Sequence, residues 1–346
     1  MTETSKEFIA DYPGGAYPVR FDAERIPMHD YPLGGRRFCI TDSNVADIYL
    51  HGGPLLPDVE HTIIFAAGEP NKKLSVVEHV LSQLAAAGAT REDHIIALGG
   101  GVVGDLAGLC AHLYQRGIPV IQVPTTLVAM ADAAYGGKTG VNLTEAKNYV
   151  GAYHQPSAVL VWPGFLETLP AQELGAGFVE VIKTGLLSGG DLWRQVQDVT
   201  ELTSEGLTEI IYSCARYKCR LVADDQYDDA DRRTLNLGHT VGHAIEAVTG
   251  YERYLHGQAV GLGMLAALRL SGADELRAQV KELLDRHQLP TMLPADVDAD
   301  DILIRTHTDK KITAGEVEYV LLPTPGDAVR RHVDDADVLR AIKELY

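Results

Sequence analysis

The segment that most restricts the possible folds is an apolar run that leads directly into a glycine-rich turn. His94–Leu98 (HIIAL) has the nearly continuous apolar character of a strand buried on both faces of a parallel sheet. Gly99–Asp105 (GGGVVGD) follows at once, and a helical pattern then runs to Tyr114. Glycines between a strand and a helix let backbone N–H groups approach a phosphate at the helix N-terminus. The segment therefore predicts an α/β domain with a dinucleotide site at this turn.

The turn matches the G-x-G-x-x-G pattern through three glycines, Gly99, Gly101 and Gly104. The standard Rossmann dinucleotide fold also places an acidic residue about twenty positions later, after the next strand. Here the next strand-like run is Pro119–Val123, and no acidic residue follows it before Asp132. The sequence therefore predicts a Rossmann-like but non-standard site, with ribose contacts supplied elsewhere, for instance by Asp42 or Glu69. A purely structural tight turn stays open as the alternative.

Neighbouring runs fit an alternating α/β arrangement. Arg37–Thr41 and His61–Ala66 have the character of strands, and Val76–Ala87 has the apolar spacing of a helix. Polar residues follow both strands, where the carboxyl ends of parallel strands meet a ligand. These residues are Asp42, Ser43, Asn44, Glu69 and Lys72.

The pattern changes near residue 165. From Gln172 the apolar spacing is helical almost throughout, in Leu174–Leu187, Glu209–Ala223, Leu237–Val248, Val260–Leu270, Ala273–His287 and Val338–Leu345. A chain of 346 residues is long enough for two domains with separate cores. We therefore expect an α/β domain over residues 1–165 and a mainly helical domain over residues 166–346.

Composition excludes several classes of function. The formal charge of −18 repels nucleic acid and anionic membrane surfaces. The first residues lack the pattern of a secretory signal, and the longest apolar run, Ala259–Leu268, is too short to span a bilayer. The four cysteines form no C-x-x-C pair and lie in apolar segments, at Cys39, Cys110, Cys214 and Cys219. We therefore expect a soluble cytoplasmic protein with reduced thiols that binds neither nucleic acid nor membranes.

Several basic residues nevertheless stand beside glycine, asparagine or apolar neighbours. They are Arg116, Lys138, Lys147, Lys183, Lys310 and Lys311. Solvated lysines would be expected to have acidic neighbours at helical spacing instead, so this set predicts a focused anion site within an acidic protein. The glycine-rich run around Lys138 lacks the G-x-x-x-x-G-K-[ST] spacing, which argues against a nucleoside triphosphatase.

Two histidines four residues apart, His239 and His243, lie in a segment with helical spacing. If this segment is one helix, Asn236 and Arg232 extend the histidine face backwards by one turn each. A histidine pair at this spacing also occurs solvated or satisfied within a core, and the spacing alone does not decide between the two. The third histidine, His256, favours a metal site, because a catalytic metal takes three protein ligands and keeps one open position.

A glutamate and a lysine three residues apart, Glu180 and Lys183, interrupt an otherwise apolar helical run. A surface ion pair is common at this spacing. The apolar neighbours Phe178, Val181 and Ile182 instead suggest an inward face, where buried charges require a metal or anion partner.

Taken together and in this order, the motifs resemble those of one family, the sugar phosphate cyclases. The motifs are TDSNV, GEPNKKL, ALGGGVVGDLAG, YQRG, QVPTTL, GGKTGVN, KNYVGA, FVEVIK, NLGHTVGHAIE, LHGQAV and DKK. The resemblance implies an NAD-binding α/β domain, a helical metal-binding domain and a homodimer. It also implies that zinc or cobalt is held by Glu180, His239 and His256.

The resemblance further implies contacts residue by residue. NAD would be contacted by Asp42, Asn44, Glu69, Lys72, Gly100, Gly101, Asp105, Thr125, Thr126, Lys138, Lys147 and Thr168. A sugar phosphate substrate would be contacted by Lys138, Lys147, Asn148, Lys218, Arg232, Asn236, His243, Lys310 and Lys311, and by Arg116 from the neighbouring subunit. The catalytic residues would be Lys138, His243, Lys183, Arg232, Asn236 and Asp132.

Within the family, the chain most resembles the branch that converts 3-deoxy-arabino-heptulosonate 7-phosphate to 3-dehydroquinate and phosphate, in the shikimate pathway to aromatic amino acids. In that reaction NAD transiently oxidises a ring hydroxyl beside a Lewis-acid metal, phosphate is eliminated, the hydride returns, and an intramolecular aldol reaction closes the ring. A substrate with a phosphate and a carboxylate accounts for the basic residues. His243 is the side chain best placed for proton transfer, because the unperturbed pKa of histidine lies near neutrality.

Other interpretations stay open. An aminodehydroquinate synthase of secondary metabolism would keep nearly the same pocket, whereas Asn236 and His243 argue against valiolone- and inosose-forming cyclases. A metal-dependent polyol dehydrogenase would share the two-domain plan but release NADH. Three sites depart from the usual family pattern: Asp228 replaces glutamate, Ala133–Tyr135 replaces Ser-Ser-Val, and Leu143–Ala146 replaces His-Pro-Leu-Gly.

Overall fold

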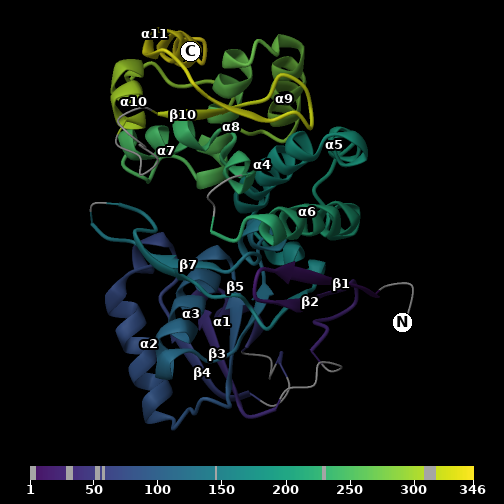
Figure 1. Ribbon diagram of the computed structural model, residues 1–346, viewed down its shortest axis with the longest axis vertical. Helices are drawn as coiled ribbons and strands as arrows, with labels where there is room; N and C mark the ends of the chain where they lie inside the picture. The colour runs from purple at the N-terminus through teal and green to yellow at the C-terminus, as the bar shows by residue number, and fades with distance from the viewer. Residues whose placement is uncertain are drawn as a thin grey trace. The chain divides into compact units, whose positions relative to one another are not determined.

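The computed structural model describes residues 5–28, 34–50, 55–56, 59–144, 146–227, 231–307 and 317–346 (Figure 1). The chain divides into two units. Unit 1 comprises Met1–Leu169 and Thr203–Tyr227, and unit 2 comprises Pro170–Leu202 and Asp228–Tyr346. The helix α6 (Ser204–Asp224) thus belongs to unit 1, although it lies in the second half of the sequence. The division of cofactor-binding and metal-binding roles near residue 165 stays a prediction.

Unit 1 is built on a seven-stranded sheet with the order β1-β2-β9-β6-β5-β3-β4. Its strands are β1 (Ser5–Tyr12), β2 (Gly15–Asp22), β3 (Arg37–Asp42), β4 (Val59–Phe65), β5 (His94–Gly99), β6 (Val120–Pro124) and β9 (Ala158–Val161). β1 and β2 form an antiparallel hairpin, and every other neighbouring pair is parallel. The sequence predicted β3 to β6 but not the hairpin at the edge.

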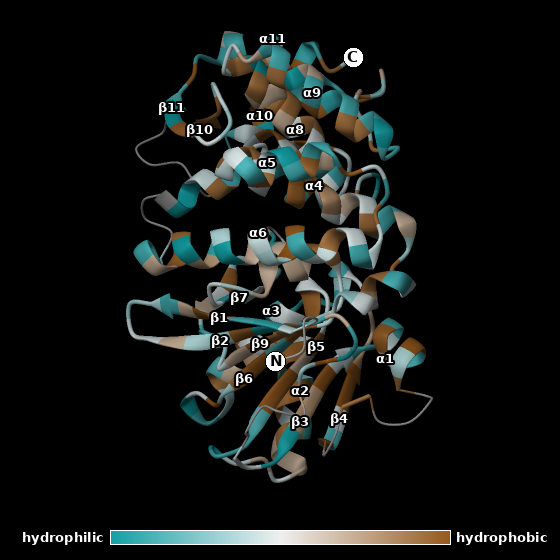
Figure 2. Ribbon diagram, turned by 90° about the vertical axis from the view of Figure 1, so that its right-hand side faces the viewer, coloured by the Kyte–Doolittle hydropathy of each residue, from teal (hydrophilic) through white to brown (hydrophobic). Residues whose placement is uncertain are grey.

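Alternate residues of the central strands explain why the helices pack where they do. Phe38 and Ile40 of β3, and Ile95 of β5, share one buried core with α2 (Leu74–Ala86) and α3 (Gly101–Leu113). β3 and β5 are buried on both faces, so they carry apolar residues at nearly every position, whereas the edge strand β4 is buried only at Ile63 and Phe65; Figure 2 shows the sheet coloured by hydropathy. The strand, glycine turn and helix predicted from sequence are confirmed as β5, Gly100 and α3.

Further elements of the described part of unit 1 include a short helix, a small hairpin and α6. α1 (Ser43–Tyr49) follows β3 directly, and β7 (Lys138–Val141) pairs antiparallel with β8 (Val150–Tyr153). α6 packs against β1, where the Tyr212 ring meets the Phe8 ring edge-on at a centroid distance of 5.6 Å.

Unit 2 is mainly helical and is organised around α8 (His256–Leu270), which is buried along almost its whole length. Such a helix is apolar on all sides because it lies inside a bundle. It packs against α4 (Ala171–Ser188), α7 (His239–Val248), α9 (Asp274–Arg286) and α11 (Asp335–Lys343). α5 (Gly190–Gln197) packs on α4, and α10 (Ala299–Thr306) packs on α7 and α11. The apolar pattern did not predict the small hairpin of β10 (Glu318–Leu321) and β11 (Val329–His332).

Among the described residues, no helix combines the length and the apolar character that crossing a membrane requires. All four cysteines lie in this part of the chain and are buried thiols outside any disulfide.

Candidate metal centre and nucleotide site

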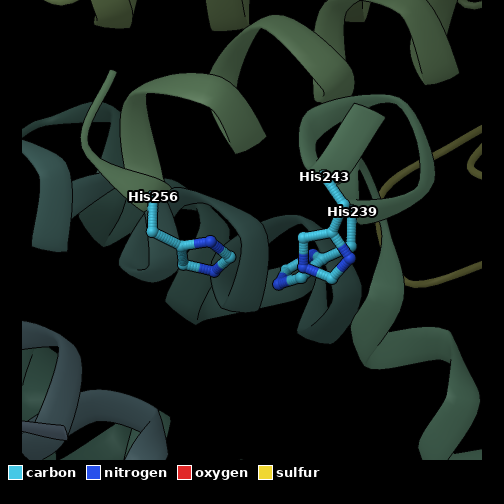
Figure 3. Close-up of side chains that lie close together, drawn as sticks. All are labelled: His239, His243 and His256. Atoms are coloured by element: carbon cyan, nitrogen blue, oxygen red, sulfur yellow. The ribbon is translucent and has the colours of Figure 1, made fainter. Parts of the chain in front are cut away.

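Three histidines of unit 2 meet at the starts of two helices (Figure 3). His239 is the first residue of α7, His243 follows one turn later, and His256 is the first residue of α8. One ring nitrogen from each histidine lies within 4.8 Å of the others, which is close enough for a shared metal ion. The structure therefore brings the three predicted histidines together.

The chain before α7 does not continue the same helix, so the predicted single helical face that joins Arg232 and Asn236 to His239 and His243 is wrong. Residues 231–236 form a short 3-10 helix, and Gly238 has a left-handed φ of 79°. A Cβ atom at residue 238 would lie 2.8 Å from the backbone nitrogen of Met264, so α8 also leaves no room for a side chain there. Asn236 instead donates to the Arg233 carbonyl oxygen at 3.0 Å, and Arg232 is almost fully buried.

Two buried charges of α4 complete this cluster. Glu180 and Lys183 are each about 1% exposed, and the Lys183 Nζ lies 2.5 Å from Glu180 Oε2. The other carboxylate oxygen, Oε1, lies 3.6 Å from His239 Nε2 and 3.7 Å from His256 Nε2. Oε1 accepts no hydrogen bond from any described residue, which leaves a buried negative oxygen between two imidazoles. A cation there would remove the cost of burying that oxygen.

The far nitrogens of two histidines are held by second partners. His239 Nδ1 lies 3.1 Å from the Leu237 carbonyl oxygen, and His256 Nδ1 lies 3.1 Å from Glu246 Oε2. Partners of this kind fix the ring orientation of metal-binding histidines and leave Nε2 directed at the ion. Sequence reasoning missed Glu246. Its position two helical turns after His239 places both residues on one face of a helix, and this spacing was the pattern that could have identified it.

Glycines bring the three helices close enough to form the cluster. A Cβ atom on Gly257 would lie 1.9 Å from the Ala176 carbonyl oxygen of α4. Between α7 and α8, a Cβ atom on Gly242 would lie 3.0 Å from the Val260 Cα atom. The backbones of α4, α7 and α8 therefore touch directly where the histidines and Glu180 project.

In unit 1, the glycine turn packs against the segment that follows β6. A Cβ atom on Gly100 would lie 2.8 Å from Thr126 Cγ2, and the Thr125 backbone nitrogen donates to the Gly99 carbonyl oxygen at 2.9 Å. Gly100 is the N-cap of α3 and offers no capping side chain, so the first N–H groups of α3 have no such acceptor. A phosphate fits that requirement. The glycines also allow this close packing, so the structural interpretation of the turn stays open beside the functional one, which stays a prediction.

A hydrogen-bonded network beside this turn joins several predicted residues. The buried Lys72 Nζ contacts Asp105 Oδ2 and Asn148 Oδ1, both at 2.5 Å. Burial raises the pKa of the Asp105 carboxyl, and the charge of Lys72 counteracts that shift. Asn142, which sequence reasoning did not single out, donates to Glu69 Oε1 at 2.7 Å and accepts from the Asn148 backbone at 2.7 Å.

The remaining predicted residues of unit 1 are more dispersed. Asp42 caps α1 by accepting from the Val45 backbone nitrogen at 2.9 Å, with Asn44 in the first turn of that helix. Thr168 shares a hydrogen bond with the Tyr49 hydroxyl.

The predicted basic residues of unit 1 lie at four places. Lys218 of α6 forms an ion pair with Asp132, and Lys138 begins β7. Lys147 lies in the loop before β8, and Arg116 has a left-handed φ of 70° in the turn after α3. Lys310, Lys311 and Asp228 lie outside the described residues.

Comparison with known proteins agrees with this geometry. Residues 62–176 match the family profile described as 3-dehydroquinate synthase N-terminal, and residues 177–312 match its C-terminal counterpart. A 2-deoxy-scyllo-inosose synthase, solved with carbaglucose-6-phosphate, NAD+ and Co2+, superimposes with a TM-score of 0.88 at 27% identity, over 99% of this chain and 100% of that one. A 2-epi-5-epi-valiolone synthase from Streptomyces hygroscopicus, with NAD+ and Zn2+ bound, gives 0.86 at 27% identity, over 95% of this chain and 96% of that one.

The fold and the histidine cluster, together with these neighbours, define a sugar phosphate cyclase. The 3-dehydroquinate synthase of Acidithiobacillus ferrooxidans is 42% identical, over 84% of this chain and 83% of the relative. That of Methylococcus capsulatus is 41% identical over 90% of each. The chain belongs to the 3-dehydroquinate synthase family. The predicted family, fold class and phosphate-eliminating enzyme class are thereby confirmed.

A probable glycerol dehydrogenase from Sinorhizobium meliloti also superimposes, with a TM-score of 0.63 at 18% identity, over 91% of each chain. That likeness concerns the fold alone. It agrees with the expectation that polyol dehydrogenases share this two-part plan.

Proposed function

We propose that this chain converts 3-deoxy-arabino-heptulosonate 7-phosphate to 3-dehydroquinate and inorganic phosphate, using NAD and a divalent metal ion. The observation that carries the proposal is the cluster of Glu180, His239 and His256 in a chain about 40% identical to 3-dehydroquinate synthases over most of its length. The similarity to those enzymes favours this substrate over the amino analogue.

Glu180, His239 and His256 are the proposed metal ligands. Two ligands of a tetrahedral zinc ion, with bonds of about 2.0–2.1 Å, lie roughly 3.3 Å apart. The separations of 3.6 Å and 3.7 Å between Glu180 Oε1 and the two Nε2 atoms support this set. His243 then stays available to move a proton at the bound sugar. When bound, the metal supplies a Lewis acid and NAD supplies a reversible hydride acceptor.

The basic residues are proposed to hold the two anionic groups of the substrate. The residues proposed to contribute are Lys138, Lys147, Asn148, Lys183, Lys218, Arg232, Asn236, Lys310 and Lys311. Asp132 would orient Lys218, with which it pairs. The cofactor is proposed to contact the glycine turn, Thr125, Thr126, and the network that contains Glu69, Lys72 and Asp105. Asp42, Asn44, Lys138, Lys147 and Thr168 complete this proposed set.

We also propose a cytoplasmic homodimer. Buried thiols outside disulfides support a reducing compartment. The exposed Arg116 sits in a turn where Gln115 and Arg116 have φ values of 47° and 70°, an uncommon pair of left-handed residues. Such a turn holds the guanidinium outward, where it could reach the neighbouring subunit. Light scattering of the purified protein would check the dimer.

The decisive experiment supplies the purified protein with the heptulosonate phosphate, zinc or cobalt, and NAD far below the substrate concentration. We expect phosphate release in many-fold excess over NAD, with no net absorbance from NADH. Stoichiometric NADH without phosphate would instead indicate a dehydrogenase. Competition between the oxygen and amino substrates would show whether the chain is an aminodehydroquinate synthase.

A further inference from the structure

Helices α7 and α8 pack against each other in an antiparallel register that repeats every four residues. Gly238, just before α7, faces Met264: a Cβ atom added there would lie 2.8 Å from the Met264 backbone nitrogen. One turn later, Gly242 faces Val260: an added Cβ atom would lie 3.0 Å from the Val260 Cα atom. One turn later again, Glu246 faces His256, with 3.1 Å between Oε2 and Nδ1. Gly238, Gly242 and Glu246 therefore follow one another along the face of α7 that meets α8.

The pairing with His256 accounts for the buried carboxylate of Glu246. Glu246 is 2% exposed, and a carboxylate at such a site costs much free energy unless a charged or hydrogen-bonding partner compensates. The helix register brings His256 to it as that partner. His256 Nδ1 is then directed at Glu246, while Nε2 is directed at Glu180 Oε1, 3.7 Å away.

The two histidines proposed as ligands are therefore held differently. A neutral backbone carbonyl, of Leu237, holds His239, whereas a carboxylate holds His256. A hydrogen bond to a carboxylate is charge-assisted, so it restricts the ring more strongly and makes the other ring nitrogen, Nε2, a better donor to a cation.

We propose that Glu246 is a positioning residue of the metal centre, which fixes the ring of His256 and thereby raises the affinity for the ion. The proposal rests on His256 being a metal ligand. It does not depend on whether Glu180 or His243 completes the set, because His256 is common to both arrangements.

The test measures metal binding directly, with zinc or cobalt in competition with a chromophoric chelator. Glu246→Ala removes the acceptor, and we expect about a 10- to 100-fold weaker metal affinity. Glu246→Gln keeps an oxygen acceptor of the same reach without the charge, so a smaller loss is expected. The visible spectrum of bound cobalt should change in both variants, because it reports the geometry of the ligands.

Thr306→Val is the matched control. Thr306 is also buried in unit 2, and its hydrogen bonds go elsewhere: its hydroxyl donates to the Leu303 carbonyl oxygen at 2.7 Å and accepts from the Tyr319 hydroxyl at 3.2 Å. Its substitution should lower the melting temperature of the metal-free protein without changing metal affinity. If Glu246→Ala fails to fold, the metal affinity and cobalt spectrum of Glu246→Gln alone decide whether the proposal stands.

The proposal is overturned if folded Glu246→Gln and Glu246→Ala keep the metal affinity and the cobalt spectrum of the wild type. It is also overturned if Thr306→Val loses as much metal affinity as Glu246→Ala. A wild-type protein that binds neither metal would overturn it as well. A wild-type protein that binds metal but releases no phosphate would instead refute the proposed function and leave this result standing.

Discussion

Gly257, the second residue of α8, offers a direct test of how the metal centre is assembled. A Cβ atom at this position would lie 1.9 Å from the Ala176 carbonyl oxygen. Ala176 precedes Glu180 by one turn on α4, and His256 precedes Gly257 on α8. The glycine contact therefore sets the distance between Glu180 and His256, and Gly257→Ala must change that distance.

The size of the effect follows from this geometry. Non-bonded carbon and oxygen atoms need roughly 3.4 Å, so the substitution must separate the helices by about 1.5 Å at this point. Metal–ligand distances tolerate only about 0.2 Å. We therefore expect zinc affinity to fall at least about tenfold, equivalent to about 1.4 kcal/mol. Overpacking should also lower the free energy of unfolding by about 1–3 kcal/mol, against a gain of up to about 1 kcal/mol from helix propensity.

Gly261→Ala, one turn further along the same helix, is the control. A Cβ atom there would meet Leu284 Cδ2 at 3.4 Å and Val179 Cγ1 at 3.6 Å, which are ordinary contacts. We expect this variant to keep its zinc affinity and to melt at the same or a higher temperature. The reasoning is refuted if Gly257→Ala binds zinc as tightly as the wild type, or if Gly261→Ala loses as much affinity.

Two further predictions concern unit 1. Burial by itself raises the pKa of Asp93, but hydrogen bonds from Arg36 and Thr90 together outweigh it and hold that pKa well below its usual range. The free energy of unfolding should therefore fall as the pH drops below about 3.9. Asp93→Asn should be less stable at pH 7 by about 1–3 kcal/mol, and urea titrations should show that its stability depends less on pH. An equally steep fall in the variant would contradict this. Lys72→Met leaves Asp105 without its buried cation, so NAD affinity in a fluorescence titration should drop while zinc affinity stays the same. The neighbouring Lys73 is exposed, so Lys73→Met should change neither affinity. Unaltered NAD binding in Lys72→Met would count against the proposed cofactor site.

Local sequence patterns were sufficient for the centre of each unit. The run of apolar residues in β5 and the glycines after it specify a strand, a turn and a helix without information from elsewhere in the chain. The apolar character of α8 likewise predicts a buried helix. The two buried charges, Glu180 and Lys183, stood out because their neighbours are apolar.

Features that depend on pairing between distant segments could not be predicted in this way. The break before α7 arises because Gly238 lies against Met264, which a helical pattern in 232–246 does not reveal. The role of Glu246 depends on the helix register that brings it to His256, and the sequence does not show that register. The β1–β2 hairpin lies at a sheet edge, where Ile9 is exposed and the apolar alternation is weak.

The matched pairs between α7 and α8 have a consequence for how this chain can change during evolution. The backbone contacts at Gly238 and Gly242 set the alignment of the two helices, so the connecting residues 249–255 do not determine where His256 points. Insertions there should be tolerated. One additional residue inside α8, by contrast, would rotate the histidine by about 100° relative to the rest of its helix. Length variation among functional relatives should accordingly collect in the connection and be excluded from the helix.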